Sequence, residues 1–134
     1  MDWKLELILL PVTDVDRAKQ FYLDTLGFTL DVDHSAGEDF RIVQLTPPGS
    51  ACSVTLMRNP DSAGRVQGLH LVVTDIEAAH AELRGRGAPV SEVFHFANGT
   101  QVSGPDPARG DYNSFVSFSD PDGNGWLVQE VGRK

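Results

Sequence analysis

The sequence predicts an α+β fold built from two consecutive modules, each made of a strand, a helix and three further strands. The main observation is a repeat: VTDVDRA at residues 12–18 returns as VTDIEAA at residues 73–79. An apolar, strand-like run precedes each copy, and apolar residues at helical spacing follow it. After each helix the pattern changes to short apolar runs separated by turn residues, which is typical of strands.

The first module begins with the run LELILL at residues 5–10, which predicts a strand. We expect the helix to be capped by the hydroxyl of Thr13, with Asp16 at the third helical position. Its apolar stripe then ends at Gly27, a usual helix stop. The stripe consists of Val15, Ala18, Tyr22 and Leu26. The remaining strands of this module are predicted at residues 28–32, 40–45 and 51–57.

The second module follows the same plan. Residues 68–72 predict its first strand, and Thr74 with Glu77 forms a capping box at the start of its helix. This helix is expected to end at Gly85 or Gly87. The next strands are predicted at residues 90–95, after a proline that a central strand cannot hold, and at residues 113–119 and 126–131.

The length of 134 residues fits one domain of ordinary size. We therefore expect a single domain over residues 1–134. Within it, module one covers residues 1–58, a polar linker covers residues 59–66, and module two covers residues 67–134.

Composition and charge argue against several classes of protein. The net charge of −8 repels phosphate backbones, so we expect no nucleic-acid partner. No apolar run approaches the roughly 20 residues of a membrane helix, so we expect no membrane partner. We read no secretion signal, and the single Cys52 cannot form an internal disulfide, so we expect a cytoplasmic protein. The acidity favours a cationic ligand or serves solubility alone.

Three stretches carry a resemblance to a known family: PVTDVDRAKQFYLDTLGF, VVTDIEAAHAELRGRG and FSDPDGNGWLVQE. Together they resemble the vicinal oxygen chelate superfamily, which includes glyoxalase I, extradiol dioxygenases, fosfomycin-modifying enzymes and bleomycin resistance proteins. The chain is closest in type to the metal-free binders similar to bleomycin resistance proteins. The resemblance implies a cup of curved mixed sheet with helices on its convex side, a ligand inside the cup, and a homodimer.

The resemblance also implies where a metal would be held. Enzymes of this superfamily bind one divalent metal with side chains from the first and last strands of each module. Counted from the repeat and the terminal turn, these positions hold Leu7, Thr55, Gly68 and Leu127. Because three of these side chains have no donor atom, we expect neither a metal nor another cofactor.

Other strand registers do not restore a metal site. A shift by two residues keeps the strand face and offers His70 and Gln129, while the opposite face offers Glu6 and Glu130. Neither set reaches the three protein ligands of a usual catalytic site. His70 falls on the predicted inner face, where it is either a hydrogen-bonded interior side chain or a ligand contact.

Without metal donors the cup becomes a mostly apolar cavity, as sites for organic ligands usually are. Residues 96–112 are expected to fold over it, with aromatic rings at their ends that stack on a flat ligand. Phe94 and Phe96 also fit a core or a dimer interface. The expected ligand-binding residues are Leu7, Leu9, Thr55, Met57, His70, Phe94, Tyr112 and Gln129.

Two functional hypotheses follow. The favoured one is metal-independent binding or sequestration of a bulky, flat or cationic small molecule, such as an antibiotic or another natural product, by a homodimer. The alternative is a glyoxalase-like or dioxygenase-like enzyme. It would be either a metal-dependent lyase or dioxygenase, or a metal-free catalyst in which His70 is the acid or base and Gln129 orients the substrate.

Overall fold

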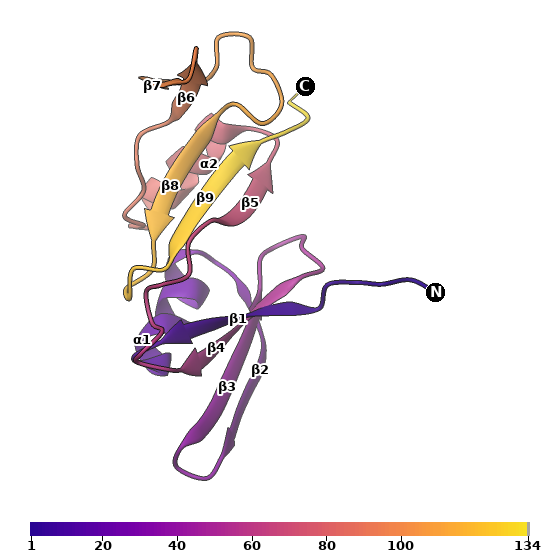
Figure 1. Cartoon of the computed structure of the whole chain (residues 1–134), viewed down its shortest axis with the longest axis vertical. Coiled ribbons are helices and arrows are strands. Elements are labelled where there is room, and N and C mark those ends of the chain that lie inside the picture. Colours follow the sequence, from indigo (N-terminus) through magenta and orange to yellow (C-terminus); the bar gives the residue numbers. More distant parts are fainter. Residues whose placement is uncertain (134) are drawn as a thin grey trace. The chain divides into compact units, whose positions relative to one another are not determined.

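Two strand–helix–strand modules follow one another in the computed structural model, which describes residues 1–133 (Figure 1). The first contains β1 (Leu7–Val12), α1 (Val15–Gln20), the π-helical turn η1 (Phe21–Thr25), β2 (Thr29–Ala36), β3 (Phe40–Thr46) and β4 (Ser53–Arg58). The second contains β5 (Leu69–Val73), α2 (Ile76–Gly85), β6 (Phe94–Ala97), β7 (Thr100–Ser103), β8 (Phe115–Ser119) and β9 (Gly125–Glu130). The predicted α+β class is confirmed.

The chain forms two compact units that nearly coincide with these modules. The first unit holds residues 1–66 together with the turn Asp120–Asn124 of the second module. The second unit holds Gln67–Ser119 and the strand that begins at Gly125. Within the described residues, no helix is both long and apolar enough to cross a membrane.

The first unit is a four-stranded mixed sheet with α1 packed against β3 and β4. The strand order is β1-β4-β3-β2, in which β1 runs parallel to β4 and the other neighbours are antiparallel. Alternate side chains face α1 and are buried, because successive residues of a strand point to opposite faces. These are Leu10, Val12, Val43, Leu45, Val54 and Leu56. We call the opposite side of this sheet the open face of the first unit.

The helix caps differ from the prediction by one residue. The sequence predicts caps at Thr13 and Thr74, whereas the structure has them at Asp14 and Asp75. The carboxylate of Asp14 accepts one backbone N–H at 3.1 Å, and that of Asp75 accepts two at 3.1 Å each. Aspartate caps as well as threonine does, and its charge suits the positive end of a helix.

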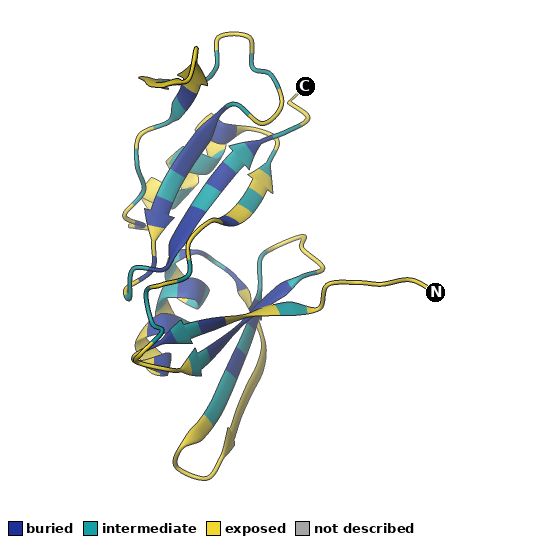
Figure 2. Ribbon diagram, viewed as in Figure 1, coloured by how far each residue is buried: buried dark blue, intermediate teal, exposed yellow. Residues whose placement is uncertain are grey.

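The second unit is a five-stranded mixed sheet with α2 packed against β8 and β9. The strand order is β5-β9-β8-β6-β7, and only β5 and β9 are parallel neighbours among the described strands. The side chains that face α2 are buried, and Figure 2 shows this alternation along β8 and β9. They include Leu69, Val116, Phe118, Trp126 and Val128. We call the other side the open face of the second unit.

The hairpin β6–β7 was not expected. The prediction placed a strand at residues 90–95, but β6 begins at Phe94 and turns back after Ala97. The turn residues Asn98 and Gly99 have φ values of 54° and 78°, the left-handed conformation that two-residue hairpin turns require. Part of the predicted loop is therefore a hairpin.

The turn of the DPDGN motif is held by a buried polar cluster. Asn124 is fully buried, and its side-chain amide donates to the carbonyl of Pro11 at 3.0 Å and to the carboxylate of Asp120 at 2.9 Å. Its side-chain oxygen accepts the N–H of Val66 at 3.2 Å. Asp120 also accepts the hydroxyl of Tyr22 at 2.8 Å. The motif therefore joins three distant parts of the first unit.

A second contact of this turn binds Thr13, the residue before the cap of α1. The hydroxyl of Thr13 donates to the carboxylate of Asp122 at 2.6 Å, and its N–H also points to that carboxylate. Arg17 contacts the same carboxylate at 3.3 Å. Thr13 is therefore bound to the DPDGN turn, and the following residue Asp14 caps α1.

Candidate functional site

Four of the predicted ligand-binding residues share the open face of the first unit. Leu9 on β1 lies beside Thr55 on β4, with Leu7 two residues before Leu9 and Met57 two residues after Thr55. Strand alternation points all four side chains away from α1. Leu9 is 57% exposed, so this end of the face is an apolar surface open to solvent.

Thr55 is the polar centre of this face. It pairs with Leu9 on one side and with Gln44 on the other, and it is only 3% exposed. Within residues 1–133, its Oγ1 is one of two buried side-chain polar atoms without a hydrogen-bond partner. Such an atom costs about 1–3 kcal/mol.

A short chain of polar side chains borders Thr55. The hydroxyl of Thr46 donates to the carboxylate of Asp31, and the Oγ1 of Thr46 lies 2.6 Å from the Oγ of Ser53. Because Thr46 gives its proton to Asp31, Ser53 donates to Thr46. Alternation in β3 places Gln44 and Thr46 on one face, but the sequence alone did not predict this chain.

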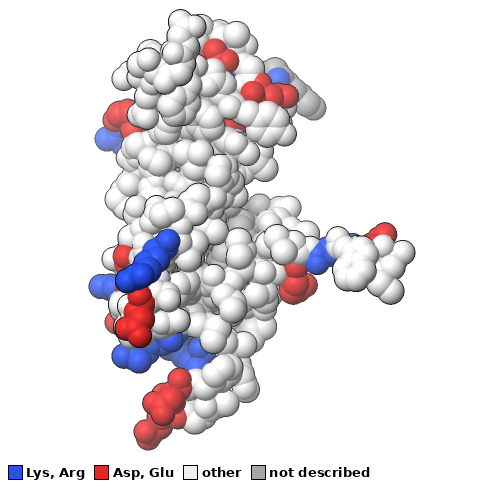
Figure 3. Space-filling model, viewed as in Figure 1, with Lys and Arg blue, Asp and Glu red and all other residues white. Residues whose placement is uncertain are grey.

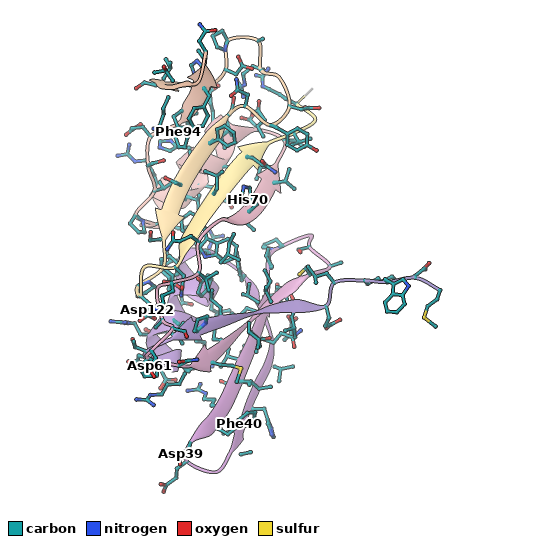
Figure 4. The ribbon with its side chains drawn as sticks, viewed as in Figure 1. Asp39, Phe40, Asp61, His70, Phe94 and Asp122 are labelled. Atoms are coloured by element: carbon teal, nitrogen blue, oxygen red, sulfur yellow. The ribbon has the colours of Figure 1, made fainter. Side chains whose placement is uncertain are left out.

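Three more predicted residues lie on the open face of the second unit. Gln129 on β9 pairs with Phe115 on β8, which pairs with Phe94 on β6, so these residues form a row across the sheet. His70 on β5 lies beside Leu127 on β9, one row away on the same face. Figure 4 labels His70 and Phe94 on this sheet.

His70 is held in one tautomer. Its Nδ1 lies 2.6 Å from the carbonyl oxygen of Gly68. A carbonyl oxygen only accepts, so Nδ1 carries the proton and the Nε2 of the neutral ring is an acceptor. His70 is exposed, so it is not the interior histidine that the sequence left open as one alternative. Its Nε2 suits a hydroxyl or N–H group of a ligand.

Phe94, Phe96 and Phe115 form a cluster on this face that we call the aromatic platform. The ring centroids lie 5.6 Å apart between Phe94 and Phe115, 5.8 Å between Phe96 and Phe115, and 6.0 Å between Phe94 and Phe96. These separations are those of favourable aromatic pairs. Phe96 is 46% exposed, whereas Phe115 is buried beneath its neighbours. The platform therefore offers an aromatic surface at the edge of the sheet.

A pocket of about 550 Å³ opens in the second unit where β5 and β9 begin and β8 ends. Its volume is within the usual range of small-molecule sites. Gly68, Ser117, Trp126 and Leu127 are among its lining residues. Gly68 has a φ of 79°, and an added Cβ would meet nothing within 4 Å. The space beside Gly68 is therefore open, although its left-handed backbone favours glycine.

The segment after β7 is attached to the α2 side of the sheet. Arg109 donates to both carboxylate oxygens of Glu130, at 2.9 and 2.6 Å, and to Glu77 at 2.7 Å. Glu130 is only 1% exposed and also accepts the N–H of Ile76 at 2.8 Å. We expected residues 96–112 to fold over the open face, but this bidentate ion pair holds their latter part beside α2.

Tyr112 lies in the loop before β8, outside the row of Gln129, Phe115 and Phe94. Its side chain is exposed, and its backbone has a φ of 63°, an uncommon conformation for a tyrosine. Its N–H donates to the carbonyl of Glu130 at 3.0 Å. The loop thus presents Tyr112 to solvent near the start of β8.

The guanidinium of Arg109 holds the pKa of Glu130 below its usual range, against the opposing effect of burial. A lowered carboxyl pKa stabilises the fold above the unfolded-state value of about 4.3 and loses that contribution as the pH falls through the folded-state value. We expect the free energy of unfolding of the wild type to fall more steeply than that of Glu130→Gln as the pH drops from 7 to 3. Urea titrations at several pH values measure both curves, and parallel curves would contradict this coupling.

The open face of the second unit is uncharged along its described strands. Figure 3 shows mostly white surface over β8 and β9, with charged atoms toward the margins. The side chains that strand pairing places on this face are His70, Val72, Phe94, Phe96, Gln101, Ser103, Phe115, Ser117, Leu127 and Gln129. Such a surface suits an organic ligand held by stacking and a few hydrogen bonds.

Both the sequence and the fold match known proteins. Residues 4–128 match the model of the Glyoxalase/Bleomycin resistance protein/Dioxygenase superfamily. The chain belongs to this superfamily.

Two solved structures from Streptomyces sp. CB03234 are similar members of the superfamily over nearly their whole length. One is TnmS3, an antibiotic binding protein, which is 30% identical with a TM-score of 0.75 and covers 98% of each chain. The other is a glyoxalase/bleomycin resistance protein, which is 31% identical with a TM-score of 0.68 and covers 95% of this chain and 100% of its own. The uncharacterized protein YetH of Bacillus subtilis (strain 168) is 26% identical over 119 residues, 89% of this chain and 91% of YetH.

The divalent metal implied by the superfamily does not fit the residues of this chain. Leu7, Thr55 and Leu127 lie on open faces, but two of these side chains have no donor atom. At Gly68 the left-handed backbone would strain any residue with a side chain. Among the described residues, no three His, Cys, Asp or Glu side chains are grouped to hold a metal. The donor chemistry of these positions therefore supports no metal-dependent step.

Proposed function

We propose that this protein binds and sequesters a bulky, flat small molecule, such as an antibiotic or another natural product, without using a metal. The observation that carries the proposal is the uncharged open face of the second unit, which has the aromatic platform and, on the same unit, a pocket of about 550 Å³. The similarity to an antibiotic binding protein at 30% identity supports the same class of function.

Each predicted residue has a role in this proposal. A flat ring system stacks on Phe94 and Phe96, while the Nε2 of His70 accepts a hydrogen bond from the ligand and the amide of Gln129 donates or accepts one. Tyr112 adds a further aromatic contact. Taken by itself, the open face of the first unit offers a ligand apolar contacts through Leu7, Leu9 and Met57 around Thr55.

Flatness is the main property that we propose for the ligand, and a positive charge is a secondary one. Stacking and dispersion need no charge on the ligand, and the residues of the platform supply no countercharge. The net charge of −8 still attracts a cation at long range. Binding of a neutral flat compound therefore tests the central part of the proposal.

We further propose that the protein acts as a cytoplasmic homodimer, with residues 1–134 forming one domain per chain. Leu9, Val72 and Phe96 are large apolar side chains exposed on the open faces. Apolar surface of this kind often marks a ligand or protein contact. Sedimentation at several protein concentrations would detect the dimer.

Purified protein should contain no stoichiometric divalent metal, yet should bind flat organic compounds. Elemental analysis of protein prepared without chelator measures the metal, and a full equivalent per chain would contradict the proposal. Thermal shift measures binding, with Nile red as a neutral flat probe and acridine orange as a cationic one. A ligand at about 100 times its Kd should raise the free energy of unfolding by about 2.7 kcal/mol.

Two variants and the fate of the ligand distinguish binding from catalysis. We expect His70→Ala to weaken binding, because the hydrogen bond to Nε2 is lost, while Thr100→Ala on exposed β7 serves as a matched control. Mass spectrometry should recover each bound natural product unchanged. Chemical conversion that depends on His70 would support an enzyme instead.

A further inference from the structure

We propose that Asn113 is a positioning residue that sets the place of Phe96 in the aromatic platform and thereby the affinity for flat ligands. The inference rests on the proposed function, because the platform affects binding only if a ligand stacks on it. Phe96 is the most exposed ring of the platform, so a ligand would depend on where this ring is held.

The backbone pairing between β6 and β8 is short. Among the described residues, the ladder between these strands consists of one pair, Phe94 with Phe115. Two residues further along, the same antiparallel register brings Phe96 opposite Asn113. A regular sheet would form the next backbone pair there.

The side chain of Asn113 takes the place of that backbone pair. Its Oδ1 accepts the N–H of Phe96 at 3.1 Å, and its Nδ2 donates to the carbonyl of Phe96 at 3.1 Å. A side-chain amide offers the same donor and acceptor as a peptide group. Both backbone groups of Phe96 are therefore bound on this side by one residue.

The chain path explains why a side chain is needed. Tyr112 and Ser114 remain paired with β9, through bonds of 3.0 Å to the carbonyl and N–H of Glu130. The left-handed φ of 63° at Tyr112 turns the chain immediately before Asn113. The chain before β8 thus stays bonded to β9 beyond Phe115. Toward β6, the side-chain amide of Asn113 reaches Phe96 in place of the backbone.

Within the hairpin, Phe96 lies opposite Gln101 of β7, and the Nδ1 of His95 lies 2.7 Å from the carbonyl of Gly104 at the base of β7. Toward β8, Phe96 is held by ring contacts with Phe94 and Phe115 and by Asn113. Loss of Asn113 should therefore free Phe96 from β8 while the hairpin and the buried core of the unit stay intact.

Amide hydrogen exchange tests the positioning step without a ligand. In Asn113→Ala, the N–H of Phe96 should exchange about tenfold faster, which corresponds to losing roughly one net hydrogen bond. Asn113→Asp keeps the acceptor for the N–H of Phe96 but loses the donor to its carbonyl, so its exchange rate should lie between those of the wild type and Asn113→Ala. Thr100→Ala should leave the exchange rate of the Phe96 N–H unchanged. In all three variants, the exchange rate of the N–H of Val116 in the core should also stay unchanged. Unchanged exchange at Phe96 in Asn113→Ala would overturn the inference.

A double-mutant cycle with Nile red tests the consequence for binding. We expect Asn113→Ala and Phe96→Ala each to raise the Kd about tenfold, since each loses a contribution of the size of one hydrogen bond or aromatic contact. The double variant should bind no more weakly than Phe96→Ala alone, because Asn113 acts through Phe96. Additive losses would show that Asn113 acts independently of Phe96 and would overturn the inference.

The two tests separate the inference from the proposed function. If the wild type binds neither Nile red nor acridine orange, the proposed preference for flat ligands fails, while hydrogen exchange still decides whether Asn113 positions Phe96. If Nile red binds but Asn113→Ala changes neither exchange nor Kd, the positioning role fails and the binding function stands.

Discussion

Replacing Arg109 with methionine is expected to lower the free energy of unfolding by about 3–5 kcal/mol, the usual loss when one partner of a buried ion pair is removed. The guanidinium makes two hydrogen bonds to Glu130, which is 1% exposed, and one to Glu77. Without Arg109, the N–H of Ile76 is the one hydrogen-bond partner that the buried carboxylate of Glu130 keeps among residues 1–133. Urea unfolding at neutral pH measures the loss.

Arg84→Met is the matched control for this prediction. Arg84 pairs with Glu92 at 3.5 Å, and both side chains are largely exposed. Exposed pairs contribute about 0–1 kcal/mol, so Arg84→Met should cause little change. The double variant Arg109→Met with Glu130→Leu should be more stable than Arg109→Met alone, because no buried charge remains. Equal small losses for both arginine variants would show that burial does not strengthen the Arg109 pair.

Replacing Asn124 with leucine should cost at least about 3 kcal/mol, because several buried groups lose partners worth about 1–3 kcal/mol each. The carbonyl of Pro11, the N–H of Val66 and the carboxylate of Asp120 all bond to the side chain of Asn124. Leucine has a similar size but cannot replace these bonds. Urea unfolding followed by circular dichroism measures the loss.

Asn59→Leu provides the control, because Asn59 is an exposed asparagine of the same unit. Surface changes of this kind usually alter stability by no more than about 0.5 kcal/mol. Tyr22→Phe removes the hydroxyl that donates to Asp120 and should be intermediate. If Asn124→Leu behaves like Asn59→Leu, the DPDGN turn does not stabilise the first unit.

The sequence predicted the sheet faces well, because strand alternation is a local property. Leu7, Leu9, Thr55 and Met57 lie on one face, as their spacing indicated. The same alternation along β8 puts Phe115 on the open face of the second unit, although Phe115 was not among the predicted ligand-binding residues. The sequence did not indicate that the Oγ1 of Thr55 is buried without a hydrogen-bond partner, because that depends on the neighbouring strands.

The predictions of the helix caps and of the segment 96–112 were less accurate. Thr13 has the right type and position for a helix cap, but its hydroxyl bonds to Asp122, which lies 109 residues away along the chain. Residues 96–112 have the composition of a free loop, but they contain β7 and the bound Arg109. The cap lies on the following aspartate in both modules, whereas for residues 96–112 the distant partner Glu130 decided between locally acceptable structures.

The two modules, the class of fold and the poor fit to a metal can be read from the amino-acid sequence, because they follow from spacing and from which side chains carry donor atoms. The roles of Arg109, Asn113 and Asn124 emerge only in the folded chain. Each of these residues stabilises the fold through partners that come close only when the sheets are formed, so no local pattern reveals them.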